Sequence, residues 1–98
     1  MQTFNDSDTL LRAEERTSGE ARYHYRLTKR ESEQVASFGL PLYSVSVQMV
    51  APDGATEATA RDCFSDEAKA CGFFDKLVNH LATPIDLPYI LEIGRAHV

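Results

Sequence analysis

The stretch Ser65–Leu81, SDEAKACGFFDKLVNHL, has the hydrophobic spacing of an amphipathic helix. At about 100° per residue, its apolar side chains fall on one side of the helix. These side chains are Ala70, Cys71, Phe73, Phe74, Leu77, Val78 and Leu81. Ser65 is the expected N-cap, because its hydroxyl can accept a hydrogen bond from a free backbone N–H of the first turn. We therefore predict a long helix over 65–81 whose apolar face is covered by another element.

Two segments before this helix alternate apolar with polar residues, as strands with one buried face do. The apolar positions are Tyr23, Tyr25 and Leu27 in 21–29, and Tyr43, Val45, Val47 and Met49 in 40–51. The turn signal Pro52-Asp53-Gly54 then leads into a return strand over 55–64. The side chains of 55–64 are small, which suits a sheet edge or a surface that a helix approaches closely.

The segment 9–17, TLLRAEERT, leaves two structures open. Its leucine, alanine, glutamate and arginine residues favour a helix by intrinsic propensity. The turn signal Ser18-Gly19-Glu20 between it and 21–29 favours a hairpin, in which 9–17 is a strand. We adopt the strand and keep the helix as the alternative.

A second, short helix is expected over about 84–92. Thr83 can cap it, Pro84 suits its first position, and Asp86 stands where a capping-box acid reaches back. Asp86 as the cap is the alternative, because Pro88 would then fall in the first turn and lose no backbone bond. The fold class is α+β. It is a small antiparallel sheet of three to four strands, at about 9–17, 21–29, 40–51 and 55–64, covered by these two helices.

The length of 98 residues indicates a single domain, which we place at 9–92. The polar residues 1–8 are expected to be disordered. The last six, IGRAHV at 93–98, look like a translated sequencing adapter, so we expect a non-native tail and give His97 no functional weight. The chain has no apolar run of about 18 residues, no signal-peptide pattern and no disulfide framework, which favours a reduced, cytoplasmic protein without a membrane partner.

The most suggestive cluster of charges is Arg22, His24 and Arg26, which alternate along one predicted strand and so share a face. They are a possible interaction face for an acidic protein or for a nucleic-acid backbone. The alternative is a solvated outer sheet face, balanced by Glu57 and Asp62 or by Glu14 of neighbouring strands. The net charge of −5 argues against nucleic acid, as does the lack of an aromatic platform among these charges, since Tyr23 and Tyr25 face the other way.

Cys63 is the weak candidate for a reactive thiol, since it lies just before a helix N-terminus, where the pKa of a thiol can fall. The ordinary interpretation is a small buried residue at the corner between strand and helix. Cys63 and Cys71 fit no zinc spacing with His24 or His80, so we expect no metal and no cofactor. No catalytic motif is present, and we therefore expect no enzyme.

The pattern resembles a family of short uncharacterised bacterial proteins, the domain-of-unknown-function family six-five-one-four. The resemblance rests on the strand motif Tyr43-Ser44-Val45-Ser46-Val47, the helix start Ser65-Asp66, the segment Thr83-Pro84-Ile85 and the motif Tyr89-Ile90-Leu91-Glu92. It covers about 9–92 and implies no known activity, cofactor or partner. We expect a small non-enzymatic module that acts through a protein partner or as a homo-oligomer. The alternatives are a nucleic-acid-associated regulator and, third, a thiol-dependent enzyme.

Overall fold

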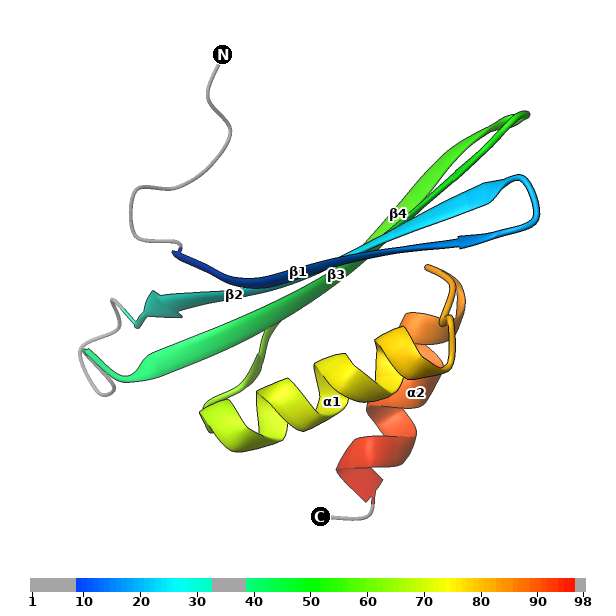
Figure 1. Ribbon diagram of the computed structural model, residues 1–98. Helices are drawn as coiled ribbons and strands as arrows, with labels where there is room; N and C mark the ends of the chain where they lie inside the picture. The colour runs from blue at the N-terminus through cyan, green and yellow to red at the C-terminus, as the bar shows by residue number, and fades with distance from the viewer. Residues whose placement is uncertain (1–8, 33–38, 97–98) are drawn as a thin grey trace.

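A computed structural model describes residues 9–32 and 39–96 and shows a four-stranded antiparallel sheet with two helices packed on one face (Figure 1). The strands are β1 (Thr9–Ser18), β2 (Ala21–Glu31), β3 (Pro41–Ala51) and β4 (Gly54–Phe64), and the helices are α1 (Glu67–Asn79) and α2 (Asp86–Ala96). The strands lie side by side in chain order, with β1 and β4 at the edges. The predicted α+β class is confirmed, and the segment 9–17 is a strand. The expectations for 1–8 and for His97 lie outside the described residues.

The core lies between the helices and the sheet face that they cover, called here the inner face. The largest fully buried side chains are Tyr25, Leu27, Val45, Val47, Phe74, Leu77 and Leu87. Burial of each apolar side chain of this size contributes about 1.5–3 kcal/mol. The strand alternation and the helical period therefore predicted both sides of this core correctly.

The N-cap of the helix α1 lies one residue later than the sequence suggests. Its N-cap is Asp66, whose backbone is extended and whose Oδ1 accepts hydrogen bonds from the N–H groups of Ala68 (2.8 Å) and Lys69 (3.2 Å). The prediction of Ser65 as the cap is wrong. A carboxylate at this position satisfies two free N–H groups and carries the charge that the helix dipole favours.

The end of α1 reverses the chain towards α2. Leu81 has the left-handed backbone conformation, with φ of 51°. The N–H of Leu81 donates to the carbonyl of Val78 (3.2 Å), and the N–H of Ala82 donates to that of Leu77 (3.0 Å). This is the Schellman arrangement, which usually has glycine at the left-handed residue. The prediction that Leu81 lies within the helix is therefore wrong: the helix ends at Asn79.

The start of α2 is held by a capping box. The N–H of Asp86 donates to Thr83 Oγ1 (3.2 Å), and the N–H of Thr83 donates to Asp86 Oδ2 (3.1 Å). The N–H of Leu87 then bonds the Thr83 carbonyl at 3.2 Å. Thr83 is therefore the cap, and Asp86 is its partner rather than the alternative cap. The helix is assigned from Asp86 and continues to Ala96, beyond the predicted end at 92.

One buried hydrogen bond joins the sheet to the turn between the helices. The hydroxyl of Tyr25, a fully buried residue of β2, donates to the carbonyl of Ala82 at 2.9 Å. Burial is the main cause that raises the pKa of Tyr25 to about 12. The phenol is thus neutral in the folded protein over the physiological range, as its role as a donor requires.

The cap assignment predicts unequal effects of two neighbouring substitutions. Asp66→Ala should lower the free energy of unfolding by about 1 kcal/mol, because two N–H groups lose their acceptor. Ser65→Ala should change it by less than about 0.5 kcal/mol, as a surface substitution does. Urea unfolding followed by circular dichroism measures both. Equal losses for the two variants would contradict the assignment.

The Tyr25 hydrogen bond predicts a loss of stability at high pH. From pH 10 to about 12 the folded protein keeps a proton that an unfolded tyrosine with an ordinary pKa of 10.0 releases, so stability falls as the pH rises through this window. Tyr25→Phe should remove part of this fall. At pH 7 it should lower the free energy of unfolding by about 1–3 kcal/mol, because the Ala82 carbonyl loses its donor. Ser65→Ala, at an exposed side chain, is the control and should leave the alkaline fall unchanged. An unchanged alkaline fall in the Tyr25 variant would refute the assigned shift.

Candidate interaction face

Three basic side chains form a stripe along β2 on the sheet face opposite the helices, called here the outer face. Tyr25 and Leu27 point inward and are fully buried, so their neighbours Arg22, His24 and Arg26 point outward. Both arginines are exposed and His24 is half-buried. The structure thus brings the three predicted residues together on one face of a central strand.

The two arginines of the stripe have no ion pair within the part of the chain that the structure describes. The residues directly opposite them on β1 and β3 are uncharged: Thr17 and Val50 for Arg22, and Ala13 and Ser46 for Arg26. His24 faces Glu15, with 3.8 Å between His24 Nε2 and Glu15 Oε2. Within the described chain, an acidic side chain therefore lies beside the stripe only at its central residue, His24.

The acids expected to balance the stripe lie mostly elsewhere. The prediction that Glu14 balances the stripe is wrong, because Glu14 is opposite the buried Tyr25 and so lies on the inner face. Asp62 pairs with Arg30 instead, through bonds of 3.0 Å from Nε and 2.6 Å from Nη2. Glu57 lies in the row of His24 but is separated from it by Gln48. The acid nearest to the stripe is Glu15, which the sequence reasoning did not weigh.

Asp62 lies in a bulge of β4, and its geometry was not foreseen. Its φ is 52°, in the left-handed region, and the β3–β4 register shifts between Tyr43 and Val45. The N–H of Asp62 donates to Ser44 Oγ at 2.8 Å. The hydrogen bond from Arg30 is the main cause that lowers the pKa of Asp62. Asp62 therefore serves as an anchor that holds the bulge to β2 and β3.

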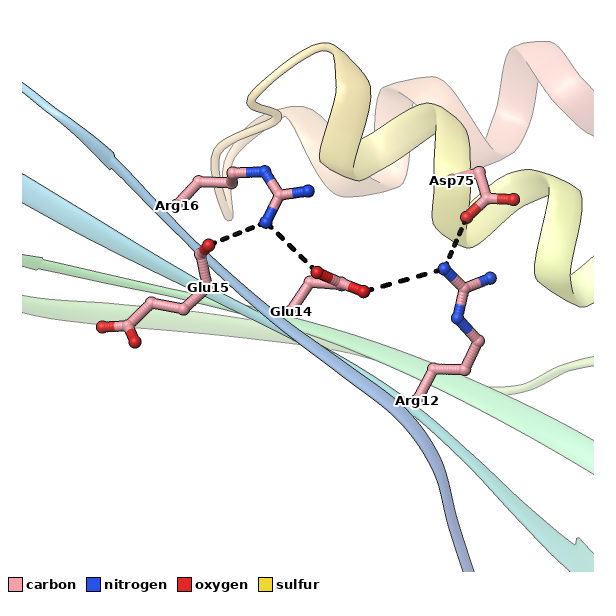
Figure 2. Close-up of polar contacts among 5 residues, drawn as sticks. All are labelled: Arg12, Glu14, Glu15, Arg16 and Asp75. Atoms are coloured by element: carbon pink, nitrogen blue, oxygen red, sulfur yellow. Dashed lines mark hydrogen bonds and ion pairs between the residues drawn. The ribbon is translucent and has the colours of Figure 1, made fainter.

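A second charged cluster lines the inner face of β1 (Figure 2). Arg12 donates to Asp75 of α1 at 2.9 Å and lies 4.9 Å from the ring centroid of Phe74. Glu14 lies between Arg12 (3.9 Å) and Arg16 (3.1 Å). The hydrogen bond with Asp75 is the main cause that raises the pKa of Arg12. The sequence reasoning missed this cluster, although the alternation of Arg12, Glu14 and Arg16 is its signal.

Cys63 lies at the corner between β4 and α1 and is buried. Its Sγ is 3.6 Å from the carbonyl oxygen of Tyr43, to which the thiol donates. Cys71 is half-buried and packs against the core. Within residues 9–32 and 39–96 no group of three histidine, cysteine or acidic side chains could hold a metal ion. The arrangement around Cys63 is that of a packed thiol with an acceptor beside it.

A shallow hollow of about 330 Å³ lies where β1 begins and β2 ends. It is lined by Thr9, Leu11, Lys29, Arg30 and Glu31. These side chains carry charges of both signs and include no nucleophile beside a base. The hollow therefore has less definite chemistry than the stripe on the outer face.

The comparison with family models gives a match over residues 8–92, to a family of unknown function. The chain belongs to DUF6514. This match agrees with the resemblance seen in the strand and helix motifs and spans all four strands and most of α2. The comparisons of this DUF6514 protein with curated proteins and with solved structures give no match. Neither described helix has the length and hydropathy needed to cross a membrane.

The Arg30–Asp62 pair of this DUF6514 protein predicts a stability loss in acid. The lowered pKa of Asp62 means that its contribution is present above the ordinary value of 3.8 and is lost as the pH falls below it. Asp62→Asn should lower the free energy of unfolding by about 1 kcal/mol at pH 7 and reduce the loss of stability in acid. Asparagine tolerates the left-handed backbone, so the substitution tests the charge alone. Asp53→Asn, in the exposed β3–β4 turn, is the control; an equal acid loss in wild type and Asp62→Asn would contradict the pairing.

Proposed function

We propose that this protein is a small non-enzymatic module that binds an acidic surface of another protein through its outer sheet face. The observation that carries the proposal is the stripe itself. Arg22 and Arg26 are exposed on a central strand, without an ion pair in the part of the chain that the structure describes. No helix of the described chain covers this face, since α1 and α2 both lie on the inner face (Figure 1).

The chemistry of the stripe suits carboxylates. A guanidinium group binds a carboxylate through two parallel hydrogen bonds, and such charge-assisted bonds are about twice as strong as neutral ones. Arg22 and Arg26 are four residues apart on a strand, which places them about 13 Å from each other. A partner with two acidic side chains at that spacing would engage both arginines, and His24 lies between them.

Other classes of function have less support. On β2 the tyrosines point to the inner face, so no aromatic side chain of that strand stands between the arginines as a platform for bases. The thiol of Cys63 is buried beside a carbonyl acceptor, which suits packing better than nucleophilic attack. Both cysteines are free, which supports a reducing compartment, and we place the function in the cytoplasm.

The proposal is tested by a charge reversal of the stripe. Affinity capture from the native host should enrich one or a few proteins on wild type, and the double variant Arg22→Glu/Arg26→Glu should lose them. Titration calorimetry with the purified captured protein should show binding weakened about tenfold or more by the double variant, with a strong dependence on salt.

The matched control is Lys69→Glu/Lys76→Glu. It makes the same change of net charge on the exposed surface of α1 and should leave the affinity unchanged. Equal weakening by both double variants would show a general charge effect and refute the face. A salt-sensitive gel shift with DNA or RNA that the stripe variant abolishes would support the nucleic-acid alternative instead.

A further inference from the structure

The two edge strands of the sheet differ in how they are protected against pairing with another chain. β1 has a bulge between Leu10 and Arg12 and three charged side chains on its inner face (Figure 2). Bulges and inward-pointing charges are the features by which natural sheets prevent edge-to-edge association. β1 is therefore a protected edge.

β4 lacks this protection over most of its length. Residues 55–60, ATEATA, contain no proline or lysine, and Glu57 is their one charged residue. β4 has a single hydrogen-bonded neighbour, β3, in the described chain. Its regular pairing with β3 runs from Gly54 to Ala60, and the bulge lies beyond that. An open edge of this length can form main-chain hydrogen bonds with an added strand.

The helix on the same side of the molecule has an uncovered apolar face. α2 packs against α1 and β4 and lies behind α1 in Figure 1, on the β4 side of the sheet. Ile85 and Tyr89 are four residues apart, so they share one side of the helical turn, and they are 76% and 65% exposed. Leu87, on the opposite side, is 2% exposed. Leu87, Ile90 and Leu91 thus pack on the core, and the pair Ile85 and Tyr89 points away from it, on the helix that contacts β4.

We propose that two copies of this chain pair through antiparallel β4 strands, with a two-fold axis at Thr59. The result is one continuous eight-stranded sheet, with the helices of both copies on the same side. In this register the regular residues Ala58–Ala60 of the two copies pair directly, and Glu57 of each copy lies opposite Arg61 of the other copy, where the bulge begins. The two Glu57–Arg61 contacts are complementary charge pairs. The α2 helices meet beneath the new pair of strands, where Ile85 and Tyr89 of the two copies cover each other.

The charges select this register among the symmetric ones. An axis at Glu57 would place two carboxylates opposite each other, and an axis at Arg61 would oppose two guanidinium groups. An axis at Ala58 would leave Glu57 opposite Thr59. Among these four axes, only the one at Thr59 places Glu57 and Arg61 of each chain opposite a residue of the other sign.

The position of α2 along the sheet agrees with the same axis. Ala58 lies in the ladder row of Tyr25, through Val47. The hydroxyl of Tyr25 binds the carbonyl of Ala82, shortly before α2 begins. The turn that leads into α2 is therefore held at the ladder row of Ala58, one residue from the proposed axis. A short strand pairing alone is weak, and the contact between the two α2 helices supplies the apolar area that it needs.

The test is a charge swap on the full chain, followed by sedimentation velocity over a range of concentrations. Wild type should form a dimer. Glu57→Arg and Arg61→Glu should each weaken it about tenfold or more, because like charges then face each other twice. An equimolar mixture of the two single variants should form a heterodimer, since the arginines of one chain face the glutamates of the other. The double variant E57R/R61E should dimerise again.

Controls separate this interface from other surfaces. Glu15→Arg, on the protected edge β1, and the stripe variant R22E/R26E should both leave the dimer intact, so failure of the acidic-partner proposal does not affect this one. Ile85→Ser/Tyr89→Ser should weaken the dimer without loss of the fold, measured by circular dichroism. A monomeric wild type at the highest concentration, or single variants that neither weaken the dimer nor rescue each other, would overturn the proposal.

Discussion

The hydrogen bond from Tyr25 to the carbonyl of Ala82 sets how the helices lie on the sheet. Its donor is a fully buried side chain on a central strand, and its acceptor is in the short turn between α1 and α2. A buried phenol without an acceptor would cost about 1–3 kcal/mol, so the turn is held where the bond can form. The left-handed Leu81 makes that turn tight enough to present the carbonyl. With the turn fixed, α1 must lie across β2, β3 and β4, and α2 must leave towards β4.

The elements that depend on local periodicity could be predicted from the sequence, and those that depend on register could not. The alternation in β2 and β3 and the helical period of α1 determined which faces are buried. The cap of α1 was missed by one residue because Ser65 and Asp66 both cap well, and the choice depends on where β4 leaves the sheet. Leu81 was placed in the helix because its apolar side chain continues the helical period, and a left-handed leucine costs about 1–2 kcal/mol. The two hydrogen bonds of the turn and the burial of Ala82 compensate for that cost.

The basic stripe was predictable because side chains alternate strictly along one strand, but its neighbours were not. The bulge at the start of β1 determines which of two adjacent acids faces outward, and a shift of one residue exchanges the faces. Glu15 therefore faces His24, while Glu14 joins Arg12 and Arg16 on the inner face. The bulge of β4 in the same way places Asp62 beside Arg30. No sequence pattern indicates a bulge that is formed by an aspartate in the left-handed backbone conformation.

The placement of the helices explains why the two edges differ. α1 and α2 pack on β4, and close approach of two helices requires small side chains such as Ala58 and Ala60. That requirement excludes the large inward-pointing charges that would protect this edge. β1 lies beyond the helices, so it has room for Arg12, whose guanidinium covers the ring of Phe74 and pairs with Asp75. The same helix positions thus protect one edge with charge and leave the other with a surface that a second strand can extend.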